Sequence, residues 1–447
     1  MRNPARSDDV LVVRGGASLH GRLRVHGAKN SALKLMAASL LAAPGETVLH
    51  NVPQIADVPA MGEILRGLGA DVTIDGETVR ITFADDPHDQ PPREHMVKLR
   101  ASITVLGPLV GRLGHATVAR PGGDRIGQRS IDFHLRGLEA IGATVIDHGD
   151  AVEVVADELH GGQITLDFPS VTATENLVMA AVLAAGPTTI DGAAREPEVV
   201  DLCRMLVEMG AHIEGIGSPT IEVDGVDELR PVTHTTVPDR IEAATFAAMA
   251  AVTGGDVELT NVRPPDLNLP LMKLRDIGAV VEEGGDTLRV KAGDLRAVNF
   301  VTLPYPGFPT DLQPQYMVLL SQAVGTSMCT ENVFESRFSF VDELHKMGAD
   351  IQIEGHHAII RGRSRLRGAV LDGLDVRAGA AGVMAGMVAD GQTVVTGVHH
   401  IDRGYAGFVE RLRSLGADIE QVPRSELDLP DLPDPDLPDL DLPGHDA

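Results

Sequence analysis

A Gly-Ala pair recurs six times along the chain at intervals of about 70 residues, and no other property limits the possible architectures as strongly. The residues before each pair follow a helical period, as Met61, Ile64 and Leu68 do, and β-branched residues follow it. A glycine at this place is typical of a left-handed helix C-cap. The repeat predicts six copies of one helix-and-strand unit, with the glycines at Gly69, Gly142, Gly210, Gly278, Gly348 and Gly416.

A second signal keeps the same spacing. Each unit also contains an apolar segment rich in alanine and glycine, such as LMAASLLAAPG or FAAMAAVTGG. Small side chains let helices pack closely, so we expect this second helix to be buried on most sides and the first to be half exposed. A period near 70 is too long for an ordinary solenoid. The pattern predicts an α/β protein of two similar globules, each with three units, and a cleft between them.

The charge of the chain excludes several classes of partner. Its 447 residues contain 38 Lys and Arg against 64 Asp and Glu, a formal net charge of −26. Such a field repels nucleic acid and anionic membranes, so any anionic ligand needs a local basic pocket. Cys203 and Cys329 have no disulfide-framework or zinc-site spacing. With no export signal and no stretch of about 18 apolar residues, we expect a cytoplasmic protein without membrane insertion.

Cations in glycine-rich segments stand out in this acidic chain. Lys29 and Asn30 lie in HGAKNSALKLMAASL, after a short predicted strand and before the first small-residue helix. Glycine and alanine there permit the close approach of a ligand, and the start of a helix adds positive potential. The segment favours an anion site, although an ordinary exposed lysine near a helix start has the same pattern.

A second segment, ARPGGDRIGQRSIDFH, places several charges among three glycines and a proline. It has the composition of a loop that closes over a ligand, and a solvated ion pair is the alternative. Its acid would donate a proton only if burial or an anionic substrate offset the neighbouring arginines, which lower a carboxyl pKa. The charged residues are Arg120, Asp124, Arg125 and Arg129.

Three further residues are candidates by their local setting. Asp311 lies in the proline-bracketed turn FPTDLQPQY, which suits a general base or an ordinary turn-capping aspartate. Arg377 and Arg403 lie near glycines, where an arginine either binds phosphate or carboxylate in a bidentate way or simply faces solvent.

Two signatures of other functions are missing or weak. Adjacent histidines at 356–357 and 399–400 would face opposite sides of a strand, which argues against a paired metal site. There is no P-loop and no dinucleotide-binding glycine motif. On the residues alone, the prediction is a two-globule α/β protein that binds a small polyanion between its halves.

Taken together in chain order, these segments resemble the UDP-N-acetylglucosamine enolpyruvyl transferase (1-carboxyvinyltransferase) family over about residues 11–422. The motifs are GAKNSALKLMAASLLA, RASITVLGPLVGRLG, PGGDRIGQR, GAAREPEVVDL, PDRIEAATF, GFPTDLQPQ, ENVFESRF and HIDRGY. The resemblance implies an inside-out α/β barrel of six units in two domains. It also implies transfer of enolpyruvate from phosphoenolpyruvate to the 3′-hydroxyl of UDP-N-acetylglucosamine, with release of phosphate, in the first committed step of peptidoglycan synthesis. The reaction needs no metal and no cofactor.

The resemblance further implies roles for single positions. Lys29, Arg129 and Arg403 match residues that hold phosphoenolpyruvate. Asp124 matches the proton donor, and Asp311 matches the base toward the attacking hydroxyl. The other substrate-binding positions that it implies are Asn30, Arg100, Ser130, Ile131, Asp132, Phe133, Phe168, Pro169, Ser170, Val171, Val333, Arg337 and Arg377.

Three positions depart from the pattern of most members of that family. Asp124 replaces a cysteine, so we expect insensitivity to the thiol-directed epoxide fosfomycin, because a carboxylic acid still donates a proton but is not alkylated like a thiolate. Thr172 replaces a glycine beside the nucleotide sugar, and Ser130 replaces a proline. Two alternatives follow, an enolpyruvyl transferase for another uridine-type acceptor and a catalytically idle ligand-binding homologue.

The domain division expected from the repeat and the resemblance is discontinuous. Residues 1–28 and 238–424 form one lobe, and residues 29–237 form a second lobe that carries the 121–130 loop. The segment from Ser425 to the end is rich in Asp and Pro, so it cannot build a core, and we expect a disordered, solvated tail.

Overall fold

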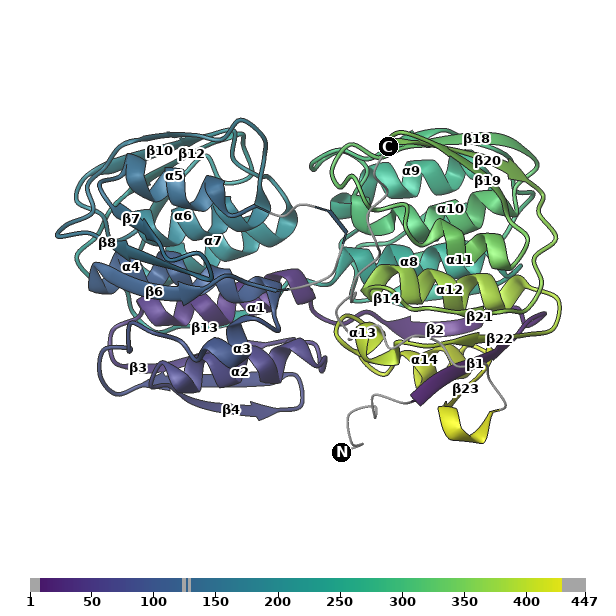
Figure 1. The fold of residues 1–447 in the computed structure, drawn as a ribbon, viewed down its shortest axis with the longest axis horizontal. Coiled ribbons are helices and arrows are strands. Elements are labelled where there is room, and N and C mark those ends of the chain that lie inside the picture. The colour runs from purple at the N-terminus through teal and green to yellow at the C-terminus, as the bar shows by residue number, and fades with distance from the viewer. Residues whose placement is uncertain (1–8, 123–125, 128–129, 428–447) are drawn as a thin grey trace, which may run out of the picture.

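The computed structural model describes residues 9–122, 126–127 and 130–427. They form two lobes that stand side by side (Figure 1), and each lobe has its own hydrophobic core. We call them the central lobe, with core residues between 32 and 229 and Ala406 packed against them, and the terminal lobe, with core residues in 11–25 and 241–419. These cores support the predicted division at 28/29 and 237/238, which stays a proposal.

The central lobe contains three units. A unit runs from a short strand to a buried helix, a strand, an amphipathic helix and two further strands; in the second unit a helix stands in place of the first strand. The elements are α1 (Lys29–Ala38), η1 (Ser39–Leu41), β3 (Gly45–His50), α2 (Asp57–Gly67), β4 (Asp71–Asp75), β5 (Thr78–Phe83), α3 (Arg93–Met96), η2 (Arg100–Val105), α4 (Leu106–Leu113), β6 (His115–Ala119), α5 (Asp132–Ala140), β7 (Thr144–Asp147), β8 (Ala151–Val155), β9 (Gln163–Thr165), α6 (Val171–Ala181), β10 (Pro187–Asp191), α7 (Pro197–Met209), β11 (His212–Glu214), β12 (Thr220–Asp224) and β13 (Thr233–Thr235).

The terminal lobe repeats this order and also holds the first two strands of the chain. Its elements are β1 (Asp9–Arg14), β2 (His20–Arg24), α8 (Arg240–Val252), β14 (Asp256–Thr260), η3 (Pro264–Leu267), α9 (Asn268–Ile277), β15 (Val280–Glu283), β16 (Thr287–Lys291), β17 (Phe300–Val301), η4 (Thr310–Leu312), α10 (Gln313–Ser321), β18 (Gly325–Thr330), α11 (Val341–Lys346), β19 (Asp350–Glu354), β20 (His357–Gly362), β21 (Val370–Leu371), α12 (Val376–Val388), β22 (Gln392–Val395), α13 (Val398–Asp402), α14 (Phe408–Ser414), β23 (Asp418–Pro423) and η5 (Arg424–Glu426).

The repeated glycines behave as the sequence predicts. All six have positive φ, between 90° and 117°, and each follows an amphipathic helix. Residues with a Cβ rarely adopt this backbone, so glycine ends each helix and turns the chain into the next strand. The prediction of six α/β units is confirmed.

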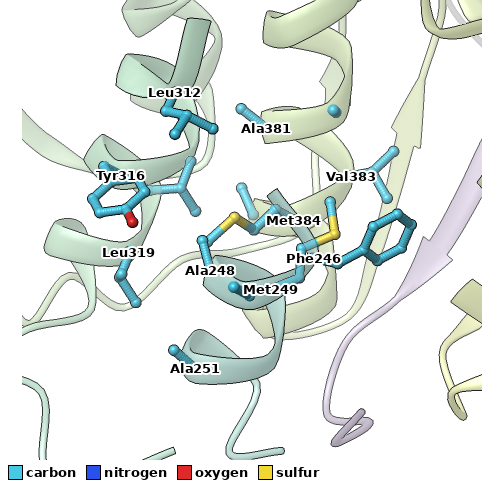
Figure 2. Close-up of a cluster of buried hydrophobic side chains, with 14 of the residues drawn as sticks. Phe246, Ala248, Met249, Ala251, Leu312, Tyr316, Leu319, Ala381, Val383 and Met384 are labelled. Atoms are coloured by element: carbon cyan, nitrogen blue, oxygen red, sulfur yellow. The ribbon is translucent and has the colours of Figure 1, made fainter. Parts of the chain in front are cut away.

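Small-residue helices fill the centre of each lobe, and sheets lie outside them. In the terminal lobe α10 contacts both α8 and α12. Figure 2 shows Met249 of α8 and Met384 of α12 in the middle of the cluster, with Phe246 of α8 on one side and Tyr316 of α10 on the other. All but one of the 13 residues of α8 are buried, whereas α9 buries only one stripe. This inside-out arrangement confirms the predicted fold class and the expected difference between the two helices.

The first and fourth units exchange their first strands. In the described residues the sheets have the orders β13-β3-β5-β4, β6-β8-β7, β11-β12-β10-β9, β15-β16-β14-β2, β17-β18-β20-β19 and β21-β22-β1-β23. Strand β2 pairs in parallel with β14, and β13 pairs in parallel with β3. Figure 1 shows β2, in purple, within the green and yellow terminal lobe. The chain therefore crosses between lobes twice, just before α1 and just before α8.

The two crossings touch each other. Gly27 and Pro238 form an isolated antiparallel bridge. A Cβ at Gly27 would lie 1.6 Å from the carbonyl oxygen of Asn51, so only glycine permits this approach. The crossings thereby place the starts of α1 and α8 next to each other at the boundary of the lobes.

The end of the described chain corrects one boundary. The predicted solvated tail does not begin at Ser425, because η5 continues the fold and Leu427 packs, partly buried, against Val10, Val12 and Val394. The remaining tail, 428–447, lies outside the described residues. No helix in the described ranges has the length and apolar character that crossing a membrane requires.

Candidate active site

A cavity of about 480 Å³ lies between the lobes, and elements of both lobes line it. Six helices begin at this cavity. Four of them are small-residue helices, and the other two, η2 and η4, lead directly into the small-residue helices α4 and α10. A helix start carries a partial positive charge and unpaired N–H groups, so their convergence favours an anion in a protein whose net charge is negative. The first residues are Lys29 (α1), Arg100 (η2), Val171 (α6), Arg240 (α8), Thr310 (η4) and Val376 (α12).

One carboxylate holds two of the predicted cations. Asp57, at the start of α2, lies with Oδ2 2.8 Å from Lys29 Nζ and with Oδ1 2.9 Å from Arg403 Nε. Burial raises the pKa of Asp57, but the two cations outweigh it and hold this pKa below its usual value. Burial lowers the pKa of Lys29, with Asp57 opposing that effect. The arrangement fixes an ammonium and a guanidinium side by side.

A second carboxylate is held by two arginines of the terminal lobe. Asp311 accepts hydrogen bonds from Arg377 Nε and Nη2 at 3.2 and 3.0 Å and from Arg337 Nη2 at 3.2 Å. Burial raises the pKa of Asp311, but the arginines hold it well below its ordinary value. Asp375 caps α12 by accepting from the backbone N–H of Arg377 at 2.6 Å. In the described residues Arg337 Nε is buried without a hydrogen-bond acceptor.

A third group closes one side of the cavity. Arg240 Nε lies 3.0 Å from Glu198 Oε1, and its guanidinium stands 5.5 Å from the ring centroid of Tyr305. The backbone N–H of Tyr305 donates to Glu196 Oε1 at 3.3 Å, which links a loop of the terminal lobe to the start of α7. Burial raises the pKa of Glu196 although Arg240 opposes it.

The structure brings most of the predicted site residues to this one cavity. Ile131 instead packs in the core of the central lobe, where it is 4% exposed. Asp124 and Arg129 lie outside the described residues. The predicted residues that line the cavity are Lys29, Asn30, Arg100, Ser130, Asp132, Phe133, Phe168, Pro169, Ser170, Val171, Asp311, Val333, Arg337, Arg377 and Arg403.

Several cavity residues were not predicted. Arg240, Glu196 and Glu198 lie within the motifs PDRIEAATF and GAAREPEVVDL, so their motifs were the available signal. Asp57 lies in NVPQIADVP, where nothing distinguishes it from a helix-starting aspartate. Its role depends on contacts with distant parts of the chain.

Comparisons with known proteins identify the family of the chain. A family model described as EPSP synthase (3-phosphoshikimate 1-carboxyvinyltransferase) matches residues 13–412. A curated relative from Corynebacterium jeikeium, named UDP-N-acetylglucosamine 1-carboxyvinyltransferase, is 55% identical over 418 residues, which are 93% of this chain and 100% of the relative. A protein of the same name from Mycobacterium leprae is 54% identical over 92% of this chain and 99% of its own length.

Solved structures share the fold. The enolpyruvyl transferase NikO from Streptomyces tendae superposes with a TM-score of 0.84 at 27% identity, over 92% of this chain and 98% of its own. An EPSP synthase from Acinetobacter baumannii superposes with a TM-score of 0.70 at 21% identity, over 93% and 99%, and is similar in fold alone. The chain belongs to the EPSP synthase family of enolpyruvyl transferases and, within it, to the UDP-N-acetylglucosamine 1-carboxyvinyltransferases.

Proposed function

We propose that this enzyme transfers the enolpyruvyl group of phosphoenolpyruvate to the 3′-hydroxyl of UDP-N-acetylglucosamine, in the cavity between the lobes. The relatives at 54–55% identity carry the name of this reaction. The observation that carries the proposal is the convergence of buried cations from both lobes on one cavity of an acidic protein. Both substrates are anions, and we propose that the enzyme acts on them in the cytoplasm, in peptidoglycan synthesis.

Lys29 and Arg403 are the proposed grip on phosphoenolpyruvate, together with Arg129, which lies outside the described residues. Asp57 holds Lys29 and Arg403 in place before substrate arrives, so the binding of phosphoenolpyruvate requires little further ordering of these two side chains. The same charges stabilise the phosphate as it leaves, where negative charge accumulates.

The proposed chemistry begins with protonation. Asp124, also outside the described residues, donates its proton to the methylene carbon of phosphoenolpyruvate. The 3′-oxygen of the acceptor bonds to the central carbon, and its proton passes to Asp311. The resulting tetrahedral intermediate breaks the bond from carbon to the phosphate oxygen. Phosphate departs and takes up the proton that Asp311 received, and the methyl group returns a proton to the Asp124 carboxylate, so that the enol ether forms.

The low pKa of Asp311 defines how it can act as a base. Its carboxylate is ionised throughout the neutral range and is a weak proton acceptor. A hydroxyl becomes far more acidic once its oxygen bonds to the electrophilic carbon, so a weak base suffices at that stage. Arg337 and Arg377 keep the carboxylate charged and oriented until then. Asp311 therefore first accepts a hydrogen bond from the 3′-hydroxyl and takes the proton late.

The test is phosphate release from phosphoenolpyruvate in the presence of UDP-N-acetylglucosamine. We expect turnover by the wild type and a loss of at least about a hundredfold in Asp124→Asn and in Asp311→Asn, because an amide neither donates the required proton nor accepts one. Comparable turnover in wild type and Asp124→Asn would refute the role of Asp124. Wild-type protein that binds UDP-N-acetylglucosamine but releases no phosphate would refute the proposed activity.

A further inference from the structure

A hydrogen-bonded pair of side chains, Thr172 and His134, lies at the edge of the candidate site. Thr172 is the second residue of α6 and lines the cavity, half-buried. Its Oγ1 lies 3.3 Å from Nε2 of His134, a residue of α5 that is 1% exposed. The direction of this hydrogen bond decides what the hydroxyl can offer to a ligand.

Asn176 fixes the tautomer of His134. The backbone N–H of Gly107 donates to Asn176 Oδ1 at 2.7 Å, and Asn176 Nδ2 donates to the carbonyl of Ile103 at 2.8 Å, so the orientation of the amide is unambiguous. The same Nδ2 lies 2.8 Å from His134 Nδ1. An amide nitrogen can only donate, so Nδ1 accepts and the proton of a neutral ring is on Nε2.

The ring is neutral in the working range of the protein. Burial, helped by the positive charge of Arg100, lowers the pKa of His134 to about 3. His134 therefore donates its Nε2–H to Thr172 Oγ1 and has no second proton to give. Both of its nitrogens are then satisfied, and the ring is held in one orientation from two sides.

The hydroxyl of Thr172 accepts this bond and keeps its own proton for another acceptor. No acceptor for it is present among the residues that the structure describes. The hydroxyl lies in the first turn of α6, where the backbone N–H groups are unpaired and the helix dipole is positive. Arg100, which also lines the cavity, adds a positive charge nearby. This setting suits an anionic oxygen of a ligand.

We propose that Thr172 is a specificity residue, which donates its hydroxyl proton to a phosphate oxygen of the nucleotide-sugar substrate while His134 holds the hydroxyl in position. The inference rests on the proposed function and deepens it. The extra side chain at this position then adds a contact for the acceptor instead of obstructing it. His134 acts through Thr172 and is a positioning residue.

The first experiment separates the hydroxyl from the bulk of the side chain. Thr172→Val keeps the volume and removes the donor, and Thr172→Ser keeps the donor and removes a methyl group. We expect Thr172→Val to raise KM for UDP-N-acetylglucosamine about tenfold with kcat within about twofold, as for a lost hydrogen bond to a charged group. Thr172→Ser should restore most of the affinity. Thr165→Val, on an exposed position of β9, is the matched control and should change neither constant.

Binding of smaller probes locates the contact on the nucleotide. Calorimetry should show weaker binding of UDP to Thr172→Val than to wild type and equal binding of uridine, which has no phosphate. Equal loss with both probes would place the contact on the ribose or base and overturn the assignment to phosphate.

Variants of His134 test the positioning role. Glutamine can accept from Asn176 and donate to Thr172 as the neutral ring does, whereas leucine can do neither. We expect His134→Leu to raise KM as Thr172→Val does, His134→Gln to retain most of the affinity, and the double variant His134→Leu/Thr172→Val to be no worse than Thr172→Val. Additive losses in the double variant would overturn the coupling between the two residues.

Two results distinguish a failure of this inference from a failure of the proposed function. If the wild type releases phosphate while Thr172→Val or Thr172→Gly binds UDP-N-acetylglucosamine as tightly as wild type or more tightly, the hydroxyl is no ligand and only the inference fails. If the wild type neither binds nor turns over UDP-N-acetylglucosamine, the proposed function fails and the inference fails with it.

Discussion

Arg403 Nε lies 2.9 Å from Asp57 Oδ1, and this ion pair joins the terminal lobe to the central lobe at the candidate site. The neighbouring backbone reinforces the junction, because the N–H of Ala56 donates to the carbonyl of Asp402 at 3.0 Å. Asp57 also holds Lys29, so one buried carboxylate sets the separation of two cations from different lobes. The spacing of the proposed phosphate grip is thus fixed by the fold before any substrate binds.

Replacing Asp57 by asparagine should damage both stability and activity. The amide is neutral and accepts from only one of Lys29 and Arg403, so both largely buried cations lose their counter-charge, a change that costs about 3 kcal/mol of unfolding free energy in comparable cases. We expect a lower thermal midpoint and a kcat reduced at least about tenfold, measured by scanning calorimetry and phosphate release.

The matched control for that variant is Asp390→Asn. It breaks an ion pair with Arg365 in which both side chains are more than half exposed, and such pairs contribute little. The control should shift the midpoint by no more than a small fraction of the Asp57→Asn effect. Equal shifts would contradict the special role given to Asp57.

The repeat predicted the fold because its signals are local. Helix periodicity and a glycine that needs positive φ are properties of a few neighbouring residues, and the structure has them at all six sites. The expected discontinuous division already placed β2 with the terminal lobe and β13 with the central lobe, and the strand pairing agrees with it. The repeat alone does not predict this exchange, because every unit has an equivalent short strand and nothing in its sequence tells which sheet it joins.

The residues of the site fall into the same two groups, those with a local sequence signal and those that depend on distant contacts. Lys29, Asp311 and Arg403 were predicted from glycine- and proline-rich segments and from motifs. Asp57 was not, since its partner Arg403 is 346 residues away and its own segment is ordinary. The histidines at 399–400, considered as strand residues, are in the short helix α13. A short segment alone does not fix a contact made across two lobes.

The pH dependence of phosphoenolpyruvate use should report Lys29. Burial lowers the pKa of this lysine below its ordinary value of 10.5, so its charge is lost as the pH rises through that lower value. We expect kcat/KM for phosphoenolpyruvate to fall on the alkaline side, because this ratio follows the free enzyme. Lys29→Arg should remove the fall, since a guanidinium stays charged. Lys273→Arg, at a partly buried position that does not line the cavity, should leave the wild-type profile intact.

A buried carboxyl group should make stability fall with rising pH. Burial raises the pKa of Glu175 from 4.5 to about 8, and Lys34 opposes this only weakly, with Nζ 3.6 Å from Oε2. Between pH 4.5 and 8 the folded chain holds a proton that the unfolded chain has released, so stability declines as the pH rises through this window.

Glu175→Gln tests that window. Glutamine does not ionise, so the thermal midpoint of the variant should decline less between pH 5 and pH 8 than that of the wild type. Glu139→Gln, which changes an exposed residue of α5, should follow the wild type. Parallel curves for wild type and Glu175→Gln would show that Glu175 does not titrate in this range.

The response to fosfomycin should depend on residue 124 alone. The epoxide reacts with a thiolate, and neither native cysteine offers one, because burial raises the pKa of Cys203 to about 12 and raises that of Cys329 further. We expect the wild type to keep its activity with fosfomycin present and Asp124→Cys to lose activity with time. Mass spectrometry of the inhibited variant should find one adduct, on the new cysteine, and none on the two buried thiols. An adduct or rapid inactivation in the wild type would mean that a group other than a thiolate at 124 reacts, and the chemical role given to Asp124 would have to be withdrawn.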